Sequence, residues 1–320
     1  MLKFCLCWRP AMASLTLAIG TLLGCSAGIA EDFKKEYWAT SLAGAVDEGI
    51  LQGLYDAVDR GEIGWLDIDP KYSIHPLKPG INLIFYHVGG NCYIGSDCER
   101  FPSSGPTQDR WSDSERVIDL DDPLAREIVV RDLVALVRQA DEIAPDGAIV
   151  GVHTDNVHRL SAAALANFFN AFLTAVDAAR QEGSISKTRQ VGYVAKNNPK
   201  AFQQALEQRL LEVKPLYQIN ENASLNQDGT LDRGSRLAQD LGRQCGIPIF
   251  LKTFGSDVAY TVEQDDEKID IHVSQDMARE MAQKPNISGL AWSVEEENYH
   301  PTMFVQGSAV RQAPTRFCGK

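Results

Sequence analysis

Several features that mark particular classes of protein are missing from this sequence. The 320 residues contain no low-complexity tract and no internal repeat, which argues against repeat and fibrous architectures. The formal net charge is -12 and no basic stripe stands out, so nucleic acid is not an expected partner. No glycine-rich dinucleotide-binding turn follows an early strand, because Gly89-Gly90 lacks the required spacing. The sequence therefore predicts no nucleotide cofactor.

The composition that remains is that of a soluble globular protein. Hydrophobic residues make up 44% of the chain and charged residues 23%. The length suits one large domain or two ordinary ones. A chain of this size buries a substantial core without help from metals or disulfide staples.

The N-terminus has the pattern of a targeting segment. Lys3 and Arg9 give a positive region, and residues 11–23 form an apolar run. The sequence Leu-Leu-Gly-Cys-Ser at residues 22–26 then resembles a bacterial lipobox, in which the cysteine is lipidated. We therefore expect residues 1–24 to be a lipoprotein signal peptide, although an ordinary signal peptide or a short membrane anchor has a similar pattern.

The lipobox predicts both a membrane partner and a location. Cys25 would carry the lipid anchor and hold the chain in the bacterial cell envelope. Ser26 is not Asp, which by resemblance to known sorting signals favours the outer membrane. Residues 25–60 would form an N-terminal tether and lead-in helix before the main domain.

Cysteine is scarce in the rest of the chain, and its spacing fits no zinc site. We therefore expect no metal and no other cofactor. Four cysteines remain besides the lipobox cysteine, and an even number in an exported protein suggests disulfides. Cys92 with Cys98 would close a small loop, and Cys245 with Cys318 would tie down the C-terminus. The sequence does not fix the pairing.

Strands and helices alternate from residue 61 to the end of the chain. Apolar β-branched runs predict up to eight strands, at residues 63–68, 81–88, 148–152, 190–196, 215–220, 247–253, 269–273 and 287–294. Helical spacing of apolar residues and N-terminal capping signals predict helices at residues 123–143, 161–182, 199–213, 231–245 and 275–283. This order favours a single-domain α/β fold at residues 61–320, a (β/α)8 TIM barrel rather than an open doubly wound sheet.

Three of the predicted strands end in compact polar clusters, at residues 153–156, 196–198 and 220–222. In a barrel of parallel strands these ends converge on one face, where ligands bind. Asp155 and Glu221 are the only carboxylates in the three clusters. A pair of carboxylates across a sugar-sized cleft is the minimal machinery of glycoside hydrolysis. The two residues are therefore a candidate catalytic pair.

These segments resemble, in order over residues 63–294, glycoside hydrolase family 114, the endo-α-1,4-polygalactosaminidase-like TIM barrels. The matching segments are Phe85-Tyr86-His87-Val88-Gly89-Gly90, Asp146-Gly147 with Val152-His153-Thr154-Asp155-Asn156, Lys196-Asn197-Asn198, Asn220-Glu221-Asn222, and Asn167 in the helix between them. The resemblance implies a hydrolase of galactosamine-containing polymers. It also implies that Asp155 and Glu221 are the catalytic pair. We expect Asp155 to be the nucleophile and Glu221 the acid/base, an order that the sequence does not fix.

The chain departs from that family at several positions. His153 and Thr154 replace the usual Glu-Pro before the proposed nucleophile. Asn198 replaces an Asp, and Asn222 replaces a Gln. These differences affect the expected substrate more than the expected chemistry, because both carboxylates are present.

Further polar and aromatic side chains are candidates for binding the polysaccharide. An amide or ammonium group near the carboxylates can hold the sugar and adjust both pKa values. Aromatic rings can stack on sugar faces, although packing in the core is an alternative use for them. The candidates are Asp67, Tyr86, His153, Asn156, Lys196, Asn197, Asn220 and Trp292.

Two other functions fit the same sequence. A non-catalytic polysaccharide-binding lipoprotein would keep the barrel and lose the activity, and the departures before Asp155 motivate this alternative. A barrel enzyme of different chemistry, such as a deacetylase or a lyase, is the third possibility.

Overall fold

The computed structural model describes residues 39–42, 64–70, 79, 81–102, 106–110, 114–157, 159–221, 223–254, 259–264, 267–272 and 275–293. All of them belong to one compact unit, Tyr37–Lys320. The predicted signal peptide, Cys25 and Cys318 lie outside the described residues.

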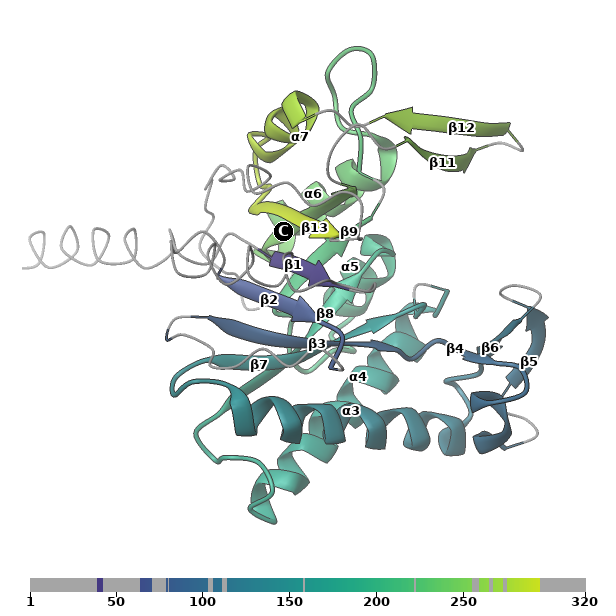
Figure 1. Ribbon diagram of the computed structural model, residues 1–320, viewed down its shortest axis with the longest axis vertical. Helices are drawn as coiled ribbons and strands as arrows, with labels where there is room; N and C mark the ends of the chain where they lie inside the picture. The colour runs from purple at the N-terminus through teal and green to yellow at the C-terminus, as the bar shows by residue number, and fades with distance from the viewer. Residues whose placement is uncertain are drawn as a thin grey trace, which may run out of the picture. The chain divides into compact units, whose positions relative to one another are not determined.

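Parallel strands curl into a closed barrel (Figure 1). Around the barrel the order is β1-β13-β10-β9-β8-β7-β3-β2, and every neighbouring pair is parallel. The eight strands are β1 (Ala39–Leu42), β2 (Trp65–Ile68), β3 (Asn82–Val88), β7 (Ile149–Asp155), β8 (Gln190–Lys196), β9 (Tyr217–Asn220), β10 (Ile249–Phe254) and β13 (Gly289–Ser293). The parallel α/β architecture expected from the alternating pattern is confirmed.

A helix follows each of five barrel strands in the part of the chain that the structure describes. These helices are α3 (Pro123–Ile143), α4 (Ala162–Gln181), α5 (Pro199–Glu207), α6 (Arg233–Cys245) and α7 (Gln275–Ala282). Side chains of Asp122, Ser161 and Asp232 accept hydrogen bonds from backbone N–H groups in the first turns of α3, α4 and α6. Such caps satisfy donors that a helix start leaves without partners, which is why the predicted helix starts are close to the observed ones.

The large core lies between the strands and these helices. Phe168, Phe169 and Phe172 of α4 are fully buried in it, and the Phe169 ring stacks on Tyr193 of β8 at 4.0 Å between centroids. By length and composition alone α4 could cross a membrane, but half of its most apolar window is buried inside the protein. The apolar character of α4 is therefore accounted for by packing against the barrel.

A second, smaller core fills the inside of the barrel. It is drawn from alternate strand positions, whose side chains point away from the helices. Tyr217 lies at its centre, with ring centroids 5.1 Å from both Trp65 and Phe250 in edge-on contacts. The full set is Trp65, Ile84, Val194, Tyr217, Ile219 and Phe250. This apolar layer, the inner core, lies directly beneath the polar residues at the strand ends.

Two insertions interrupt the strand–helix alternation. Between β3 and α3 lies an antiparallel sheet of β4 (Asn91–Tyr93), β5 (Pro106–Arg110) and β6 (Glu115–Ile118), with a short 3-10 helix, η2 (Asp97–Arg100). Between β10 and α7 lies a hairpin of β11 (Ala259–Gln264) and β12 (Glu267–His272). Each insertion begins where a barrel strand ends, on the face that carries the site.

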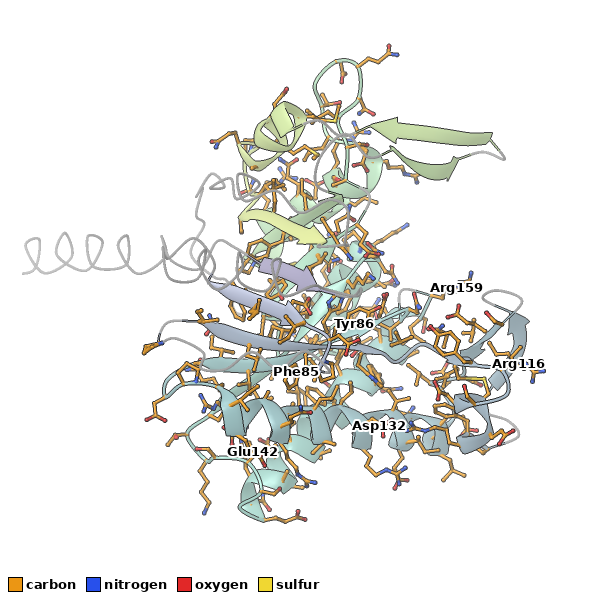
Figure 2. The ribbon with its side chains drawn as sticks, viewed as in Figure 1. Phe85, Tyr86, Arg116, Asp132, Glu142 and Arg159 are labelled. Atoms are coloured by element: carbon orange, nitrogen blue, oxygen red, sulfur yellow. A yellow bond between two sulfur atoms is a disulfide. The ribbon has the colours of Figure 1, made fainter. Side chains whose placement is uncertain are left out.

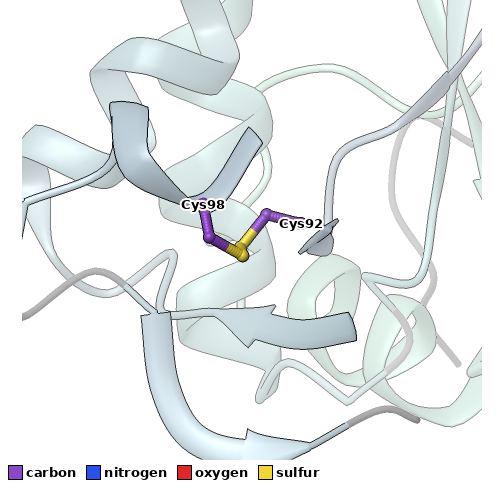
Figure 3. The surroundings of a disulfide bond; sticks show 2 residues. All are labelled: Cys92 and Cys98. Carbon is purple, nitrogen blue, oxygen red and sulfur yellow. A yellow bond between two sulfur atoms is a disulfide. The ribbon is translucent and has the colours of Figure 1, made fainter. Parts of the chain in front are cut away.

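A disulfide between Cys92 and Cys98 ties β4 to η2, as expected for these cysteines (Figure 3). Their Cα atoms are 5.0 Å apart. Cys245 at the end of α6 is disulfide-bonded too. Its partner lies outside the described residues, so the pairing with Cys318 stays a prediction.

Three expectations about secondary structure were wrong. Residues 39–42, assigned to a lead-in helix, form β1 and pair with β2 and β13. Of residues 269–273, counted as a barrel strand, residues 269–272 belong to hairpin strand β12 instead, and residue 273 lies outside the described residues. Helix α5 ends at Glu207 rather than near residue 213, before Arg209 takes a left-handed backbone conformation. The number of barrel strands was thus right, although one of the members was not.

Gly151 and Gly192 leave room for the side chain of Leu216 beside the inner core of the barrel. A Cβ atom on Gly192 would lie 2.6 Å from Leu216 Cγ, and one on Gly151 would lie 3.1 Å from Leu216 Cδ1. Leu216 packs against the inner core. Small and large residues therefore complement each other across neighbouring strands.

This complementarity predicts a double-mutant result. Gly192→Ala should destabilise the fold by about 1–3 kcal/mol because it overpacks this point, and Leu216→Ala by about 2 kcal/mol because it leaves a cavity. The double variant should lose at least ~0.5 kcal/mol less than the sum, since removing Leu216 relieves the clash. Urea unfolding of the four proteins measures this coupling. Gly192→Ala combined with Leu237→Ala, an exposed leucine on α6, is the control; additive losses in both pairs would contradict the packing described.

Candidate active site

On each strand, the polar residue of the site comes two positions after a residue of the inner core, the smaller apolar core inside the barrel. Because side chains alternate along a strand, a residue two positions after an inner-core residue also points inward. Asp67 follows Trp65 in this way, Tyr86 follows Ile84, Lys196 follows Val194, Glu221 follows Ile219, and Lys252 follows Phe250. On β7 the same inward series is Gly151, His153 and Asp155. The strands thus bring six segments of the chain together at one end of the barrel.

Asp155 is the last residue of β7, and both of its carboxylate oxygens have partners. The hydroxyl of Tyr86 donates to Oδ2 at 2.5 Å, and Lys196 Nζ lies 2.6 Å from the same oxygen. The backbone N–H of Asn156 donates to Oδ1 at 2.6 Å. Asp155 is 8% exposed. It is therefore fixed in position and still accessible at the strand end.

Lys196 joins the two predicted carboxylates. Its Nζ atom lies 2.9 Å from Glu221 Oε1 as well as 2.6 Å from Asp155 Oδ2. These two oxygens are consequently no more than about 5.5 Å apart, the sum of the two distances. The sequence expectation that Asp155 and Glu221 would meet on one face of the barrel agrees with this geometry.

Glu221 follows the last residue of β9 and is held from three sides. Lys252 Nζ donates to Oε1 at 2.7 Å, and the side-chain amide of Asn197 donates to Oε2 at 3.3 Å. The Asn197 side-chain oxygen also accepts from the Glu221 backbone N–H at 2.9 Å. The Glu221 side chain is 21% exposed, against 5% for Lys196 and 7% for Lys252. The carboxylate therefore faces the open end, and the two ammonium groups lie beneath it.

The lysines set the charge state of both carboxylates. Burial favours the neutral acid, but the attraction of Lys252 and Lys196 lowers the pKa of Glu221 to about 2. Burial acts against ionisation of Asp155 in the same way, yet Lys196 and the Tyr86 hydroxyl hold the pKa of Asp155 well below its ordinary value. For Lys252, the attraction of Glu221 outweighs burial and raises the pKa. At neutral pH the ligand-free site contains two carboxylates and at least one charged lysine.

Tyr86 supports Asp155 from β3, and its position can be followed in Figure 2. Burial and the adjacent Asp155 raise the pKa of Tyr86 far above its ordinary value. The hydroxyl therefore remains a hydrogen-bond donor. Lys196 Nζ lies 6.0 Å from the centroid of the Tyr86 ring, at the outer limit of a cation–π contact.

Asp67 and His153 form a pair with no exposed surface under the site. His153 Nδ1 lies 2.5 Å from Asp67 Oδ2, and both residues are 0% exposed. The His153 ring meets the Tyr86 ring edge-on at 5.2 Å between centroids. Neither predicted sugar-binding residue has surface for a ligand here; the pair packs beneath Tyr86 and so fixes the ring that contacts Asp155.

The strand ends turn sharply beside the carboxylates. Asn156 and Asn197 have φ values of 62° and 49°, in the left-handed region that asparagine tolerates better than most residues. The Asn156 side chain donates to Asn91 Oδ1 at 2.7 Å. A Cβ atom on Gly90 would lie 1.9 Å from the Asn156 carbonyl oxygen. Glycine is therefore required where the chain leaving β3 crosses the end of β7.

Two predicted binding residues are not among these contacts. Asn220 is 5% exposed, and its side chain donates to Ser235 Oγ of α6 at 3.2 Å. Asn220 is in register with Leu251 of β10, which belongs to the large core between the strands and the helices. Asn220 therefore lies on the helix side of β9. Trp292 of β13 is in register with Thr253 of β10, and the side chain of Trp292 lies outside the described residues.

Lys252 was missed by sequence reasoning. It was read as part of the apolar run at residues 247–253, where a lysine attracts little notice. A usable signal was present, because a lysine that continues the inward alternation of a buried strand has no access to solvent except at the strand end. In the described part of the chain, no three His, Cys, Asp or Glu side chains come together as metal ligands would.

The fold and site together define a parallel α/β barrel with a polar centre of two carboxylates and two lysines at its strand ends. Among solved structures, the chain is similar to Aspergillus fumigatus Ega3 in complex with galactosamine, with 16% identity, a TM-score of 0.50, and 85% of this chain and 94% of that chain covered. It is also similar to the glycoside hydrolase domain of a PelA variant from Pseudomonas aeruginosa, with 15% identity, a TM-score of 0.44, and 68% and 84% coverage.

At such identities the likeness concerns the fold, which is one that glycoside hydrolases use. No protein-family model matches the chain, and no curated protein matches it in sequence.

The contacts of Glu221 predict how its titration responds to Lys252. In Lys252→Met the pKa of Glu221 should rise by at least about 1 unit, because the nearest stabilising cation is gone. The stability contributed by the depressed pKa is present above the unfolded value of ~4.3 and is lost as pH falls. In the variant that loss should therefore begin at higher pH. Carbon-13 NMR of labelled glutamate side chains, with Glu221→Gln for assignment, measures the shift.

The matched control for this titration is Lys284→Met. Lys284 forms its ion pair with Glu280 at 2.8 Å, at a site where Glu280 is exposed. Its loss should leave the Glu221 titration unchanged. An unshifted Glu221 in Lys252→Met would refute the electrostatic role of the lysine.

Proposed function

We propose that this protein is a glycoside hydrolase that cleaves α-linked galactosamine- or N-acetylgalactosamine-containing polysaccharide with Asp155 and Glu221. The observation that carries the proposal is the bridge through Lys196, which limits the nearest carboxylate oxygens to about 5.5 Å. Retaining glycosidases place their two carboxyl groups about 5–5.5 Å apart, whereas inverting enzymes need about 6.5–9.5 Å for a water molecule. The shared lysine brings one oxygen of each carboxylate into this shorter range, and we therefore propose a retaining reaction.

In a retaining reaction Asp155 attacks the anomeric carbon and forms a glycosyl ester, while Glu221 gives its proton to the departing glycosidic oxygen. Water then attacks the anomeric carbon, its proton passes to Glu221, and the bond to Asp155 breaks. Asp155 suits the nucleophile because its low pKa keeps it ionised. Tyr86 and Asn156 hold its two oxygens in place.

Glu221 has to carry a proton for the first step, although its pKa is about 2 without ligand. Substrate binding excludes water from a carboxylate that is 21% exposed, and desolvation favours the neutral acid. The negative charge of Asp155 also raises the pKa of Glu221. Formation of the glycosyl ester removes the negative charge of Asp155, so this effect on the pKa of Glu221 then disappears. Glu221 has lost its proton by that stage and can accept one from the attacking water.

The nature of the substrate is inferred from two sources. The ordered motifs resemble the polygalactosaminidase-like family, and the fold is similar to that of Ega3, which was crystallised with galactosamine. We also propose that the eight closed strands belong to a complete (β/α)8 barrel, with further helices beyond α3–α7.

Substitution of either carboxylate should abolish the activity. Glu221→Gln should lower kcat by about 10²–10⁴-fold, as loss of a general acid does, and Asp155→Asn at least as much. Release of reducing ends from a galactosamine-containing polymer measures the effect. Asp146→Asn and Glu142→Gln are matched controls, because both residues are exposed and Asp146 precedes β7, at the opposite end of the strand from Asp155. Wild-type activity in Asp155→Asn would refute the mechanism.

The lipobox supports a second proposal, a lipid anchor at Cys25 in the outer membrane of a bacterial envelope. Cys25→Ser should leave the chain unlipidated and unprocessed by the lipoprotein peptidase. Labelling of growing cells with radioactive palmitate, followed by membrane fractionation, provides the measurement. Label in Cys25→Ser equal to that in wild type would contradict the assignment, and Cys245→Ser is a control that should retain the label.

A non-catalytic polysaccharide-binding protein is the alternative. It is favoured by one observation, the double pairing of Glu221 with lysines that keeps the carboxylate ionised in the free protein. Tight binding of oligosaccharide by the wild-type protein without release of reducing ends would establish this function instead.

A further inference from the structure

The connection from β3 to β4 holds the end of β7 in place. Beyond the last pair of the β3–β7 ladder, the backbone N–H groups of Gly89 and Gly90 both donate to the Asp155 carbonyl oxygen, at 3.3 and 3.0 Å. The Gly90 carbonyl oxygen in turn accepts from the Ile118 backbone N–H at 2.9 Å. The backbone of the proposed nucleophile is therefore attached to the start of the antiparallel insertion.

The side chain of Asn91, the next residue, reaches the turn that follows Asp155. Asn91 Oδ1 accepts from the Asn156 side-chain amide at 2.7 Å, and the Asn156 backbone N–H donates to Asp155 Oδ1 at 2.6 Å. Asn91 is 4% exposed, and among the described residues its Nδ2 atom has no hydrogen-bond partner. A buried donor without a partner costs about 1–3 kcal/mol, so the amide is not explained by stability alone.

Asn156 needs such support because of its backbone conformation. Its φ of 62° lies in the left-handed region, which costs a residue other than glycine on the order of 1–3 kcal/mol. In this conformation the Asn156 N–H points back to the preceding carboxylate. A turn that relaxed to a negative φ would move this donor away from Asp155 Oδ1.

Asn91 is itself held by the disulfide beside it. Cys92 is 1% exposed and is bonded to Cys98 of η2 (Figure 3). η2 is attached to α3 by the ion pair of Arg100 with Asp132. On its other side β4 pairs with β6 in an antiparallel ladder. The disulfide thus connects Asn91 to a long helix of the barrel.

We propose that Asn91, fixed by the Cys92–Cys98 disulfide, is a positioning residue for the nucleophile Asp155. This role rests on the proposed hydrolase function and adds a residue to its mechanism. Asn91 acts through Asn156, because it holds the turn whose N–H fixes one oxygen of the nucleophile. Reduction of the disulfide therefore weakens catalysis.

Asn91→Ala tests the positioning role. The full-length protein in detergent should lose about 10- to 100-fold in kcat on a galactosamine-containing polymer, because small displacements of a reacting group cost this much. KM should stay near the wild-type value, since so buried a residue offers almost no surface to substrate. Wild-type kcat in Asn91→Ala would overturn the proposal.

The matched control for this substitution is Asn170→Ala. The Asn170 amide donates to the Leu210 carbonyl oxygen at 2.7 Å. Leu210 lies in the loop that enters β9, at the end of the strand away from Glu221. Asn170→Ala thus removes a comparable hydrogen bond and should leave kcat unchanged.

A double-mutant cycle separates positioning from a general loss of structure. Asn156→Gly removes the side-chain amide and tolerates the left-handed backbone. If Asn91 acts through that amide, Asn91→Ala should lower kcat by less than about threefold in the Asn156→Gly background. An equal loss in both backgrounds is the result of a merely structural defect and would overturn the assignment. If Asn91→Ala does not fold, Asn91→Ser, a smaller change that also removes the amide, takes its place.

Reduction of the disulfide gives a second readout. Dithiothreitol supplies two electrons and two protons to the Cys92–Cys98 bond, which becomes two thiols while the dithiol closes to a cyclic disulfide. The kcat of the wild type should fall, and reoxidation should restore it. Cys98→Ser lacks the bond, so its kcat should be low from the start and insensitive to the dithiol. Wild-type kcat in Cys98→Ser would overturn the role of the disulfide. Cys245→Ser, which removes the disulfide of α6, should respond to the dithiol as the wild type does.

Failure of the hydrolase function has a different signature. A wild-type protein that cleaves no polymer refutes the hydrolase, and hydrogen exchange of the Asn156 backbone amide then decides the positioning role. In Asn91→Ala and in Cys98→Ser this amide should exchange at least about tenfold faster than in the wild type, because the turn that holds it against Asp155 opens more often. Unchanged exchange in either variant overturns the proposal. Asn170→Ala should keep the wild-type exchange rate.

Discussion

The contact between one ammonium group and two carboxylates, Lys196 with Asp155 and Glu221, is the interaction on which the site depends. Two carboxylates within about 5.5 Å in a poorly solvated place would repel each other, and one would take up a proton. The shared lysine allows both to remain charged. Lys252 adds a second cation at the same oxygen of Glu221, Oε1. The charges are thus compatible only as a group, and removal of one leaves another buried without compensation.

The barrel makes this arrangement possible through the two-residue alternation of its strands. The inner apolar layer around Tyr217 fixes the strands relative to one another, and the next inward position on each strand is then fixed as well. Side chains on strands are held in position more precisely than side chains on loops. An active site needs this precision, because its catalytic groups have to be placed to within tenths of an ångström. The glycines at 90, 151 and 192 serve the same end, because each lets a neighbouring segment approach closely.

Much of this could be predicted from the sequence because the signals are local. Apolar runs that end abruptly in polar residues located strands β7, β8 and β9, and with them Asp155, Lys196 and Glu221, although β7 continues to Asp155 instead of ending at residue 152. β1 could not be found in this way, since Ala-Thr-Ser-Leu is short and has no distinctive pattern; its pairing with β2 and β13 defines it. The contact of His153 with Asp67 spans 86 positions, so only the closed barrel reveals it.

The overall charge and the local charge of the protein lead to different expectations, and the local charge governs the chemistry. A chain with a net charge of -12 attracts cations from a distance. In salt, screening limits the range of this attraction to about 10 Å. The attraction therefore acts while a ligand approaches the protein. At the carboxylates, contacts of 2.6–2.9 Å with buried lysines set the energy of anything that binds. The overall charge therefore bears on how a ligand approaches the protein, and the contacts around Asp155 and Glu221 bear on how the ligand is held.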